Sequence, residues 1–430
     1  MGRKIGQKII GNVIILLVGV LVGFTALLLV FCLPVEPMQI HVQQSLPMIE
    51  QEFVSSTVIE GYPATLTGNF TDCLMLEHAV YENDEHSLFS QVLYMYRGEI
   101  SNGEGWAPGY SLAYYLQFFT QAREVEYARY WHGYLVVLKP LLLLTTFNSI
   151  RMLASIVQLI LVGVLIMAYT KRGDTFLGFA LLVSMPFLYF FSLYYSLSLS
   201  ICFYLMTVIL LVQQKWHEKL LSRHLYCEFF LIAGMATAYF DFLTYPLVTL
   251  GFPLVVALYW EDSGWKKMLG KLVGYSAEWA VGYLGFWACK WVLTDILTGG
   301  NIIQDAFHTL SVRTDVAWSR SFIGGFVYVL QQNVSVYLNW PFVLLILGIA
   351  VSLFVFLWKR KSILKGSAGW KEALVIGGAA LFPLGWFMLT QNHSEQHWMY
   401  THKIFSVTVF AAICFVGKWV KGRTTSDDSN

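Results

Sequence analysis

Residues 9–33 read IIGNVIILLVGVLVGFTALLLVFCL, an apolar run without a charged side chain. About 20 apolar residues in a helix cross the hydrocarbon core of a bilayer, so this run is long enough to span it. A signal-peptide core has about 7 to 15 apolar residues and is followed by a small-residue cleavage pattern. The run exceeds that length, lacks the pattern and follows the basic residues Arg3, Lys4 and Lys8. It therefore predicts a retained membrane anchor.

The composition of the whole chain agrees with this interpretation. Of 430 residues, 57% are hydrophobic and 13% charged, whereas soluble domains are about 25% charged. We therefore predict an all-α fold, a polytopic transmembrane helical bundle. The 28 Lys and Arg residues nearly balance the 27 Asp and Glu residues, which argues against a nucleic-acid partner. The six cysteines show neither a disulfide framework nor a zinc spacing.

Further apolar segments have lengths close to that of a spanning helix. They lie near 152–170, 174–191, 196–213, 226–243, 246–260, 271–294, 340–358, 372–390 and 404–421. With the first anchor, they predict about ten spans. Two more apolar stretches, 131–147 and 321–338, contain polar interruptions, which suit a half-inserted or interfacial helix better than a full span.

The distribution of basic residues orients the spans. If 131–147 and 321–338 stay on the outer face, most of the 28 Lys and Arg residues fall in inner loops. This is the asymmetry of the positive-inside rule. It predicts a multi-pass protein of the cell membrane with both termini in the cytoplasm, and it places most acids and histidines on the outer face.

This topology divides the chain into six parts. The parts are a cytoplasmic tip with the first anchor (1–33), an outer loop with membrane-surface helices and a half-inserted helix (34–151), a transmembrane bundle (152–294), a second outer loop (295–339), the C-terminal spans (340–421) and a cytoplasmic tail (422–430).

Two acids on the outer face are candidate catalytic residues. Asp72, in GNFTDCLML, either caps a helix through LMLEHAVY or acts as a general base. Asp241 lies between two spans in FDFLTYP. It is either an interfacial acid that reaches water or a functional carboxylate at the membrane boundary.

Several basic side chains on the same face are candidate ligands for a substrate. His132 and Lys139 lie in the stretch 131–147, and Lys290 lies near the outer end of a predicted span that also contains Glu278. Glu278 and Lys290 are about 18 Å apart along a helix, so each needs a partner on another helix. Lys290 either reaches the interface or faces an anionic headgroup.

Charges of alternating sign mark the second outer loop. The segment DAFHTLSVRTDVAWSR contains His308, Arg313 and Arg320 among its charged and titratable residues. Such a segment is either a solvated helix face or a phosphate clamp, because Arg binds phosphate oxygens in bidentate fashion.

The stretch 391–402, QNHSEQHWMYTH, contains three of the ten histidines. His393 and His397 are four residues apart, which places both imidazoles on one face of a helix. The HExxH pattern of zinc proteases is absent, since Ser394 stands where it requires Glu. We therefore favour hydrogen bonding to a phosphate or sugar over metal binding. The alternatives for this stretch are an ordinary polar turn and a divalent metal site. No other cofactor is predicted.

This layout of an anchor, a long outer loop with an early acid, and many spans with basic outer turns resembles the GT-C superfamily of integral-membrane glycosyltransferases. The resemblance is one of layout over most of the chain. It implies a polyprenyl-phosphate-linked sugar donor, Asp72 as the base that activates the acceptor, and Arg313, Arg320, His393 and His397 as ligands of the carrier phosphate.

The predicted function is therefore transfer of a sugar from a lipid-linked donor to an acceptor on the outer face, with membrane lipids as further partners. A transporter or lipid flippase is the alternative, and would place ionisable residues at the bilayer midplane, where Glu278 is the clear example. Another lipid-modifying enzyme, such as an acyltransferase, would use the same outer His and Asp residues.

Overall fold

The computed structural model describes residues 2–52, 57–62, 65–99, 112–113, 115–117, 122–316, 320–359 and 369–427. About 80% of the described residues are helical. Within the described residues, the only sheet pairs two short antiparallel strands, β1 (Arg97–Glu99) and β2 (Arg123–Val125). The predicted helix-rich class is confirmed, with this small sheet as an addition that the sequence did not indicate.

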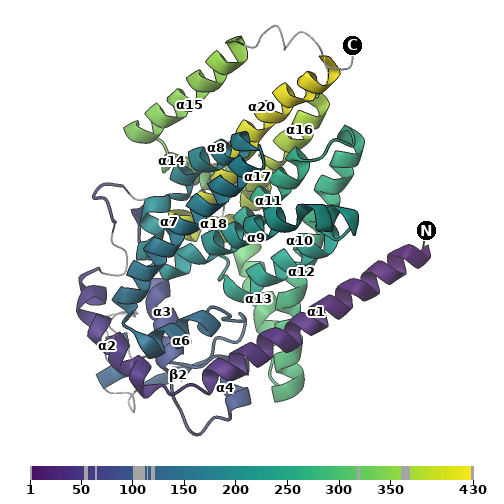
Figure 1. The fold of residues 1–430 in the computed structure, drawn as a ribbon. Coiled ribbons are helices and arrows are strands. Elements are labelled where there is room, and N and C mark those ends of the chain that lie inside the picture. Colours follow the sequence, from purple (N-terminus) through teal and green to yellow (C-terminus); the bar gives the residue numbers. More distant parts are fainter. Residues whose placement is uncertain are drawn as a thin grey trace.

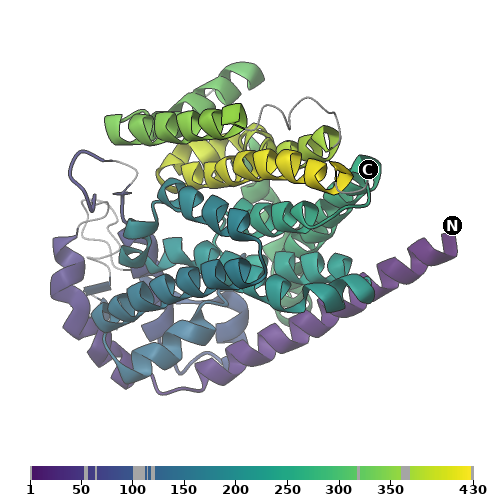
Figure 2. The same ribbon diagram turned by 45° about the horizontal axis from the view of Figure 1, so that its top comes forward.

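The N-terminal third combines one long helix with shorter ones. Helix α1 (Gly2–Phe31) runs obliquely along the outside of the bundle, and its N-terminal end projects beyond the other helices (Figures 1 and 2). The shorter helices that follow are α2 (Glu36–Gln51), α3 (Asn69–Val80), α4 (Leu88–Tyr94) and α6 (Leu135–Leu144).

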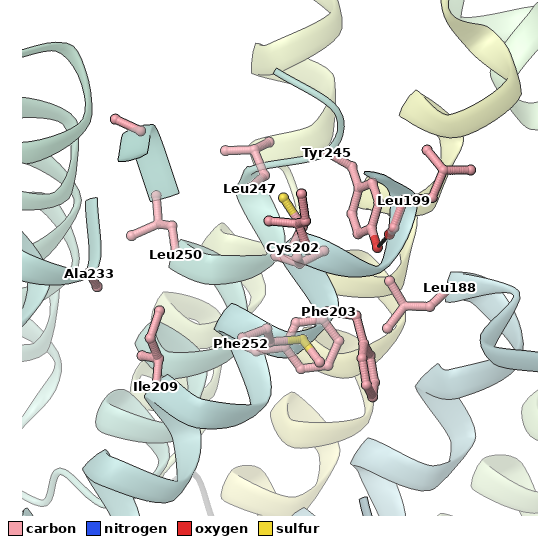
Figure 3. Close-up of a cluster of buried hydrophobic side chains, with 14 of the residues drawn as sticks. Leu188, Leu199, Cys202, Phe203, Ile209, Ala233, Tyr245, Leu247, Leu250 and Phe252 are labelled. Atoms are coloured by element: carbon pink, nitrogen blue, oxygen red, sulfur yellow. Dashed lines mark hydrogen bonds between the residues drawn. The ribbon is translucent and has the colours of Figure 1, made fainter. Parts of the chain in front are cut away.

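The central helices form the core of the bundle. They are α7 (Phe147–Lys171), α8 (Thr175–Ser184), α9 (Leu197–Ser222), α10 (Tyr226–Phe240), α11 (Leu247–Tyr259) and α12 (Trp265–Thr298), with 3-10 turns η3 (Met185–Leu188) and η4 (Phe190–Tyr195). Every residue of α11 is buried, as expected for a helix that is apolar on all sides. Figure 3 shows Phe252 of α11 beside Cys202 and Phe203 of α9.

The C-terminal third is made of shorter pieces around two long helices. It comprises α13 (Ile302–Thr314), α14 (Phe322–Ser335), α15 (Trp340–Lys359), α16 (Trp370–Ala379), α17 (Phe382–Leu389), α18 (Gln391–Gln396), α19 (Trp398–Thr401), η7 (His402–Ile404) and α20 (Phe405–Asp427). Helix α15 buries none of its residues and lies at the edge of the bundle (Figure 1).

Six helical segments in the described part are long and apolar enough to cross a membrane: Gly6–Phe31, Phe147–Lys171, Leu197–Ser222, Trp340–Lys359, Trp370–Leu389 and Trp398–Lys421. Each coincides with a predicted span. Four further apolar helices are shorter: Leu135–Leu144, Thr175–Leu188, Tyr226–Phe240 and Leu247–Tyr259. The multi-pass character is therefore supported by six helices, whereas the count of about ten spans stays a prediction.

The two ambiguous stretches form short helices. Helix α6 has 10 residues and α14 has 14, which correspond to about 15 and 21 Å at 1.5 Å per residue. Both are shorter than the roughly 30 Å of a hydrocarbon core. In α6, Pro140 lacks the N–H group for a helical hydrogen bond. These lengths suit the half-inserted or interfacial position that the sequence favoured.

Helix α3 differs from the expected membrane-surface helix. All of its residues from Asp72 to Val80 are buried, and it packs against α2, α6 and α9. Its acid Glu77 forms an ion pair with Arg97 of β1 at 3.0 Å. Helix α3 is therefore enclosed by protein. Its acid Glu77 can be buried because the partner Arg97 lies on a neighbouring element.

Candidate active site

The turn after α10 organises the candidate site. The Asp241 carboxylate accepts hydrogen bonds from the backbone N–H of Thr244 at 2.9 Å and from the Thr244 hydroxyl. Leu243 has φ of +68°, a left-handed conformation that is unfavourable for a side chain of this kind. Tyr245 ties the turn to α9, because its hydroxyl donates to the Leu199 carbonyl (Figure 3). The turn is thus held at both ends.

His393 of α18 binds this turn through one of its ring nitrogens. Its Nε2 lies 2.8 Å from the Leu243 carbonyl oxygen, so Nε2 carries the proton and donates it. Nδ1 is then an acceptor with a lone pair. The residue is 2% exposed, and among the described residues Nδ1 has no hydrogen-bond partner. The result is a buried, oriented imidazole whose Nδ1 lone pair has no partner in the described part of the chain.

A second imidazole and a guanidinium lie beside it. The ring of His397 is 4.7 Å from that of His393, and Arg313 at the end of α13 donates to His397 Nε2 at 2.9 Å and to Gln396 at 3.1 Å. Burial and the Arg313 charge lower the pKa of His397 to about 4. Burial, His397 and Arg313 also lower the pKa of His393 well below its usual range. Both imidazoles are therefore neutral near pH 7, next to a permanent cation.

Two tyrosines complete this cluster. Tyr130 and Tyr400 both interact electrostatically with the Arg313 guanidinium and with the Asp241 carboxylate. The Tyr400 ring stacks on His397 at 5.2 Å. The structure therefore brings together three regions that the sequence placed on one face: the Asp241 turn, the end of α13 and the stretch 391–402. We call Asp241, Arg313, His393, His397, Tyr130 and Tyr400 the His393 cluster.

His132 supports the wall of the cluster. Its φ is +55°, and both ring nitrogens are occupied: Nε2 lies 2.9 Å from the Tyr127 carbonyl and Nδ1 3.0 Å from the Tyr134 hydroxyl. The ring also packs against Phe242 at 5.4 Å. His132 thus fixes the segment that carries Tyr130 and has no free nitrogen for a ligand.

Ion pairs position α13 and Arg320, both from the predicted second outer loop. Asp305 binds Arg129 at 2.7 Å, which fastens α13 to the segment that carries Tyr130. Arg320 binds Glu395 of α18 at 3.3 Å and lies over the Tyr328 ring at 3.6 Å. The alternating charges therefore hold α13 and α18 in place and do not form a uniformly solvated face. His308 is exposed on α13 and lies apart from the His393 cluster.

Asp72 lies at the start of α9. Its side chain is 0% exposed, and its two carboxylate oxygens accept the backbone N–H groups of Leu197 and Ser198, both at 2.9 Å. Arg151 lies 3.6 Å away. Burial raises the pKa of Asp72, while Arg151 and the two amides oppose the shift. The prediction that Asp72 caps its own helix is therefore wrong: α3 has Gly68 at its N-cap without a side-chain cap, and Asp72 caps the first turn of α9 instead.

Lys139 and Lys290 bind helices near their C-terminal ends, whereas Asp72 binds an N-terminal end. Lys139 Nζ donates to the Ala79 carbonyl at 2.8 Å, near the end of α3. Lys290 Nζ donates to the carbonyls of Val92 and Leu93 at 3.0 and 2.7 Å, near the end of α4. A cation is favourable at a helix C-terminus, where free carbonyls carry partial negative charge. Both lysines lie outside the His393 cluster.

The His393 cluster shows no metal centre. Among the described residues, no group of three or more His, Cys, Asp or Glu side chains is arranged to hold a metal ion. Tyr130 and Tyr400 could not be identified from the sequence, because single tyrosines in an aromatic-rich chain have no diagnostic spacing.

An apolar groove of about 470 Å³ lies on the flank of the bundle. Its walls come from α3, α6, α7, α9 and α10, and they include Tyr134, Leu138, Leu153, Val157, Leu205 and Phe240. Phe240 directly precedes Asp241, and the Tyr134 ring lies 4.8 Å from that of Phe242. The groove therefore begins beside the turn that holds His393.

Fold and site together define a helix-rich protein with several membrane-length helices and a buried polar site in which two imidazoles adjoin a guanidinium. The chain matches no protein-family model, no curated protein and no solved structure.

Proposed function

We propose that the chain is a membrane glycosyltransferase that moves a sugar from a polyprenyl-phosphate-linked donor to an acceptor hydroxyl at the outer face of the membrane. The observation that carries the proposal is the buried, unpartnered Nδ1 of His393 beside Arg313. A neutral imidazole nitrogen next to a fixed cation suits a reaction in which a hydroxyl loses a proton while a phosphate leaves.

In the proposed reaction, the acceptor oxygen attacks the anomeric carbon of the donor sugar. The bond between that carbon and the phosphate oxygen breaks, and the polyprenyl phosphate leaves with the bonding electrons. His393 Nδ1 takes the proton of the acceptor hydroxyl. Arg313 stabilises the charge that develops on the phosphate, since guanidinium groups form strong charge-assisted hydrogen bonds to phosphate oxygens.

The apolar groove supplies a place for the lipid part of the donor. It is lined by hydrophobic side chains of α6, α7 and α9, and α7 and α9 are long and apolar enough to cross a membrane. A polyprenyl chain bound there would keep its carbons in an apolar environment and bring its phosphate toward the Asp241 turn.

The two acids act through other groups in this proposal. Asp72 holds the first turn of α9 with both carboxylate oxygens, and Asp241 holds the turn that presents the Leu243 carbonyl to His393. This changes the assignment implied by the resemblance to GT-C enzymes, in which Asp72 is the base. His393 now has that role, and the two acids position the site.

The test compares variants in sugar transfer from a panel of undecaprenyl-phosphate-linked hexoses in proteoliposomes. We expect His393→Ala to lower kcat by about 10²- to 10⁴-fold, the usual contribution of a general base, and Arg313→Gln to impair use of the donor. His308→Ala is the matched control, because His308 is exposed and has no role in the proposal.

Thermal unfolding of each purified variant separates loss of chemistry from loss of fold. Wild-type transfer by a folded His393→Ala protein would remove His393 from the mechanism. A folded Asp72→Asn protein without activity would return the role of base to Asp72. The transporter alternative requires Glu278 to carry protons. In the structure, Glu278 binds Lys8 at 2.5 Å and Asn12 at 2.7 Å, and we expect Glu278→Gln to leave transfer unchanged.

A further inference from the structure

A second groove lies between the first turns of α12 and α16. It has a volume of about 390 Å³, and its apolar walls are Trp265, Leu269, Leu272, Trp370, Leu374 and Val375. We call it the α12–α16 groove. Helix α12 has 34 residues, about 51 Å in length, and α13 with Arg313 follows its other end. The groove is therefore far from the His393 cluster, toward the opposite face of the membrane.

Lysines surround the mouth of this groove. Lys371 Nζ lies 6.0 Å from the centre of the Trp265 ring and 5.8 Å from that of Trp370, and Lys266 Nζ lies 5.7 Å from the Trp265 ring. Lys266, Lys267 and Lys371 are exposed. The acid nearby, Glu372, accepts a hydrogen bond from the Trp265 backbone N–H at 3.2 Å. Lys266, Lys267 and Lys371 thus outnumber the carboxylate of Glu372.

The walls of the groove face outward. Leu269 is 44% exposed and Leu374 51% exposed, although both lie on helices within an apolar bundle. Tryptophan and lysine are the side chains that concentrate at the boundary between hydrocarbon and headgroups. A groove with apolar walls, two tryptophans and a cationic mouth combines surfaces for a hydrocarbon chain and for a phosphate. Basic pockets between transmembrane helices bind anionic headgroups on the cytoplasmic side.

We propose that the α12–α16 groove binds one anionic glycerophospholipid of the inner leaflet. An acyl chain lies against Leu269, Leu272 and Leu374, and the phosphate lies between Lys266 and Lys371. We expect an anionic lipid because of charge complementarity. A zwitterionic headgroup would place its own positive group near the lysines, which would repel it. The proposal is independent of the proposed glycosyl transfer.

The experiment counts lipids that stay bound to the purified protein by native mass spectrometry. The protein is incubated in detergent with equal amounts of phosphatidylglycerol and phosphatidylcholine. We expect the wild type to retain phosphatidylglycerol in at least fivefold preference, and Lys266→Gln/Lys371→Gln to lose that preference. Leu374→Trp keeps the lysines but fills the groove, and we expect it to lower retention as well.

Lys219→Gln is the matched control. Lys219 Nζ lies 5.7 Å from the Trp216 ring on α9, the same lysine–tryptophan contact away from the groove, and we expect this variant to retain phosphatidylglycerol. Equal retention of the two lipids by the wild type, unchanged preference in Lys266→Gln/Lys371→Gln, or an equal loss in Lys219→Gln would overturn the proposal. Displacement of the lipid by millimolar inorganic phosphate would show a phosphate site without a lipid requirement, and would also overturn it.

Discussion

Single ionisable side chains bind the ends of neighbouring helices. Asp72 binds free N–H groups at the start of α9, whereas Lys139 and Lys290 bind free carbonyls near the ends of α3 and α4. Backbone groups at helix ends have no partner within their own helix, and in an apolar environment an unsatisfied group costs several kcal/mol. At the residue scale, these three charged side chains, which the sequence suggested as parts of a substrate site, form hydrogen bonds to backbone groups at helix ends.

The pKa of His397 gives a prediction at this scale. Its pKa is lowered from 6.5 to about 4 by burial and Arg313. Between these values the unfolded chain binds a proton that the folded protein does not, so acidification favours unfolding. The contribution of the neutral His397 side chain to the free energy of unfolding is fully present above about pH 6.5 and decreases as the pH falls toward 4. We expect thermal unfolding in detergent to show a smaller decrease in Tm between pH 7.5 and 4.5 for His397→Gln than for the wild type.

Gln at this position can still accept a hydrogen bond from Arg313, so the comparison isolates the titration of the imidazole. His393 also loses a neighbour that lowers its pKa, which reduces the pH dependence of stability in the same direction. Identical pH dependence of Tm in the two proteins would contradict the prediction.

At the scale of elements, α10 and α12 cross with their backbones in contact. A Cβ atom added at Gly282 of α12 would lie 2.0 Å from the Leu231 carbonyl oxygen, and one at Gly234 of α10 would lie 2.1 Å from the Trp279 carbonyl oxygen. Small residues allow membrane helices to approach this closely. The crossing places α12 beside α10, and α10 ends at the Asp241 turn, so the two glycines help to position the candidate site.

We predict that Gly282→Ala destabilises the protein by about 1–3 kcal/mol, the usual cost of overpacking, since its methyl group meets backbone that cannot move aside. The measurement is the yield and apparent Tm of detergent-purified protein. Gly274→Ala on the same helix is the control, because a Cβ there meets nothing within 4 Å. Equal stability of the two variants would contradict the prediction, because it would mean that α10 and α12 can move apart without a loss of stability.

At the scale of the whole molecule, the charge distribution predicts the orientation in the membrane. Ser311 lies in the predicted second outer loop and Ser263 in a predicted inner loop, and both are exposed. In a chain with the exposed Cys32 replaced by Ser, we expect Ser311→Cys to react with a membrane-impermeant maleimide in intact cells. Ser263→Cys should react only after the cells are permeabilised. The opposite pattern would invert the predicted topology.

Different parts of the structure could be predicted to different extents. The six membrane-length helices were visible as apolar runs, because bilayer thickness sets their length. The burial of α3 was not visible, since its partners lie on α2, α6 and α9. For the candidate site, the position of His393 and His397 on one face was readable from spacing, whereas Tyr130 and Tyr400 had no spacing to reveal them.

The sequence by itself determined a helix-rich protein with membrane-length helices and polar chemistry concentrated in a few loops, because apolar length and charge asymmetry are local properties. Tertiary structure alone decided which polar groups meet. His393 binds the Leu243 carbonyl 150 residues away, and Arg313 binds His397 across 84 residues. Those contacts depend on how helices cross and on the left-handed turn at Leu243, and neither is encoded in the spacing of residues along the chain.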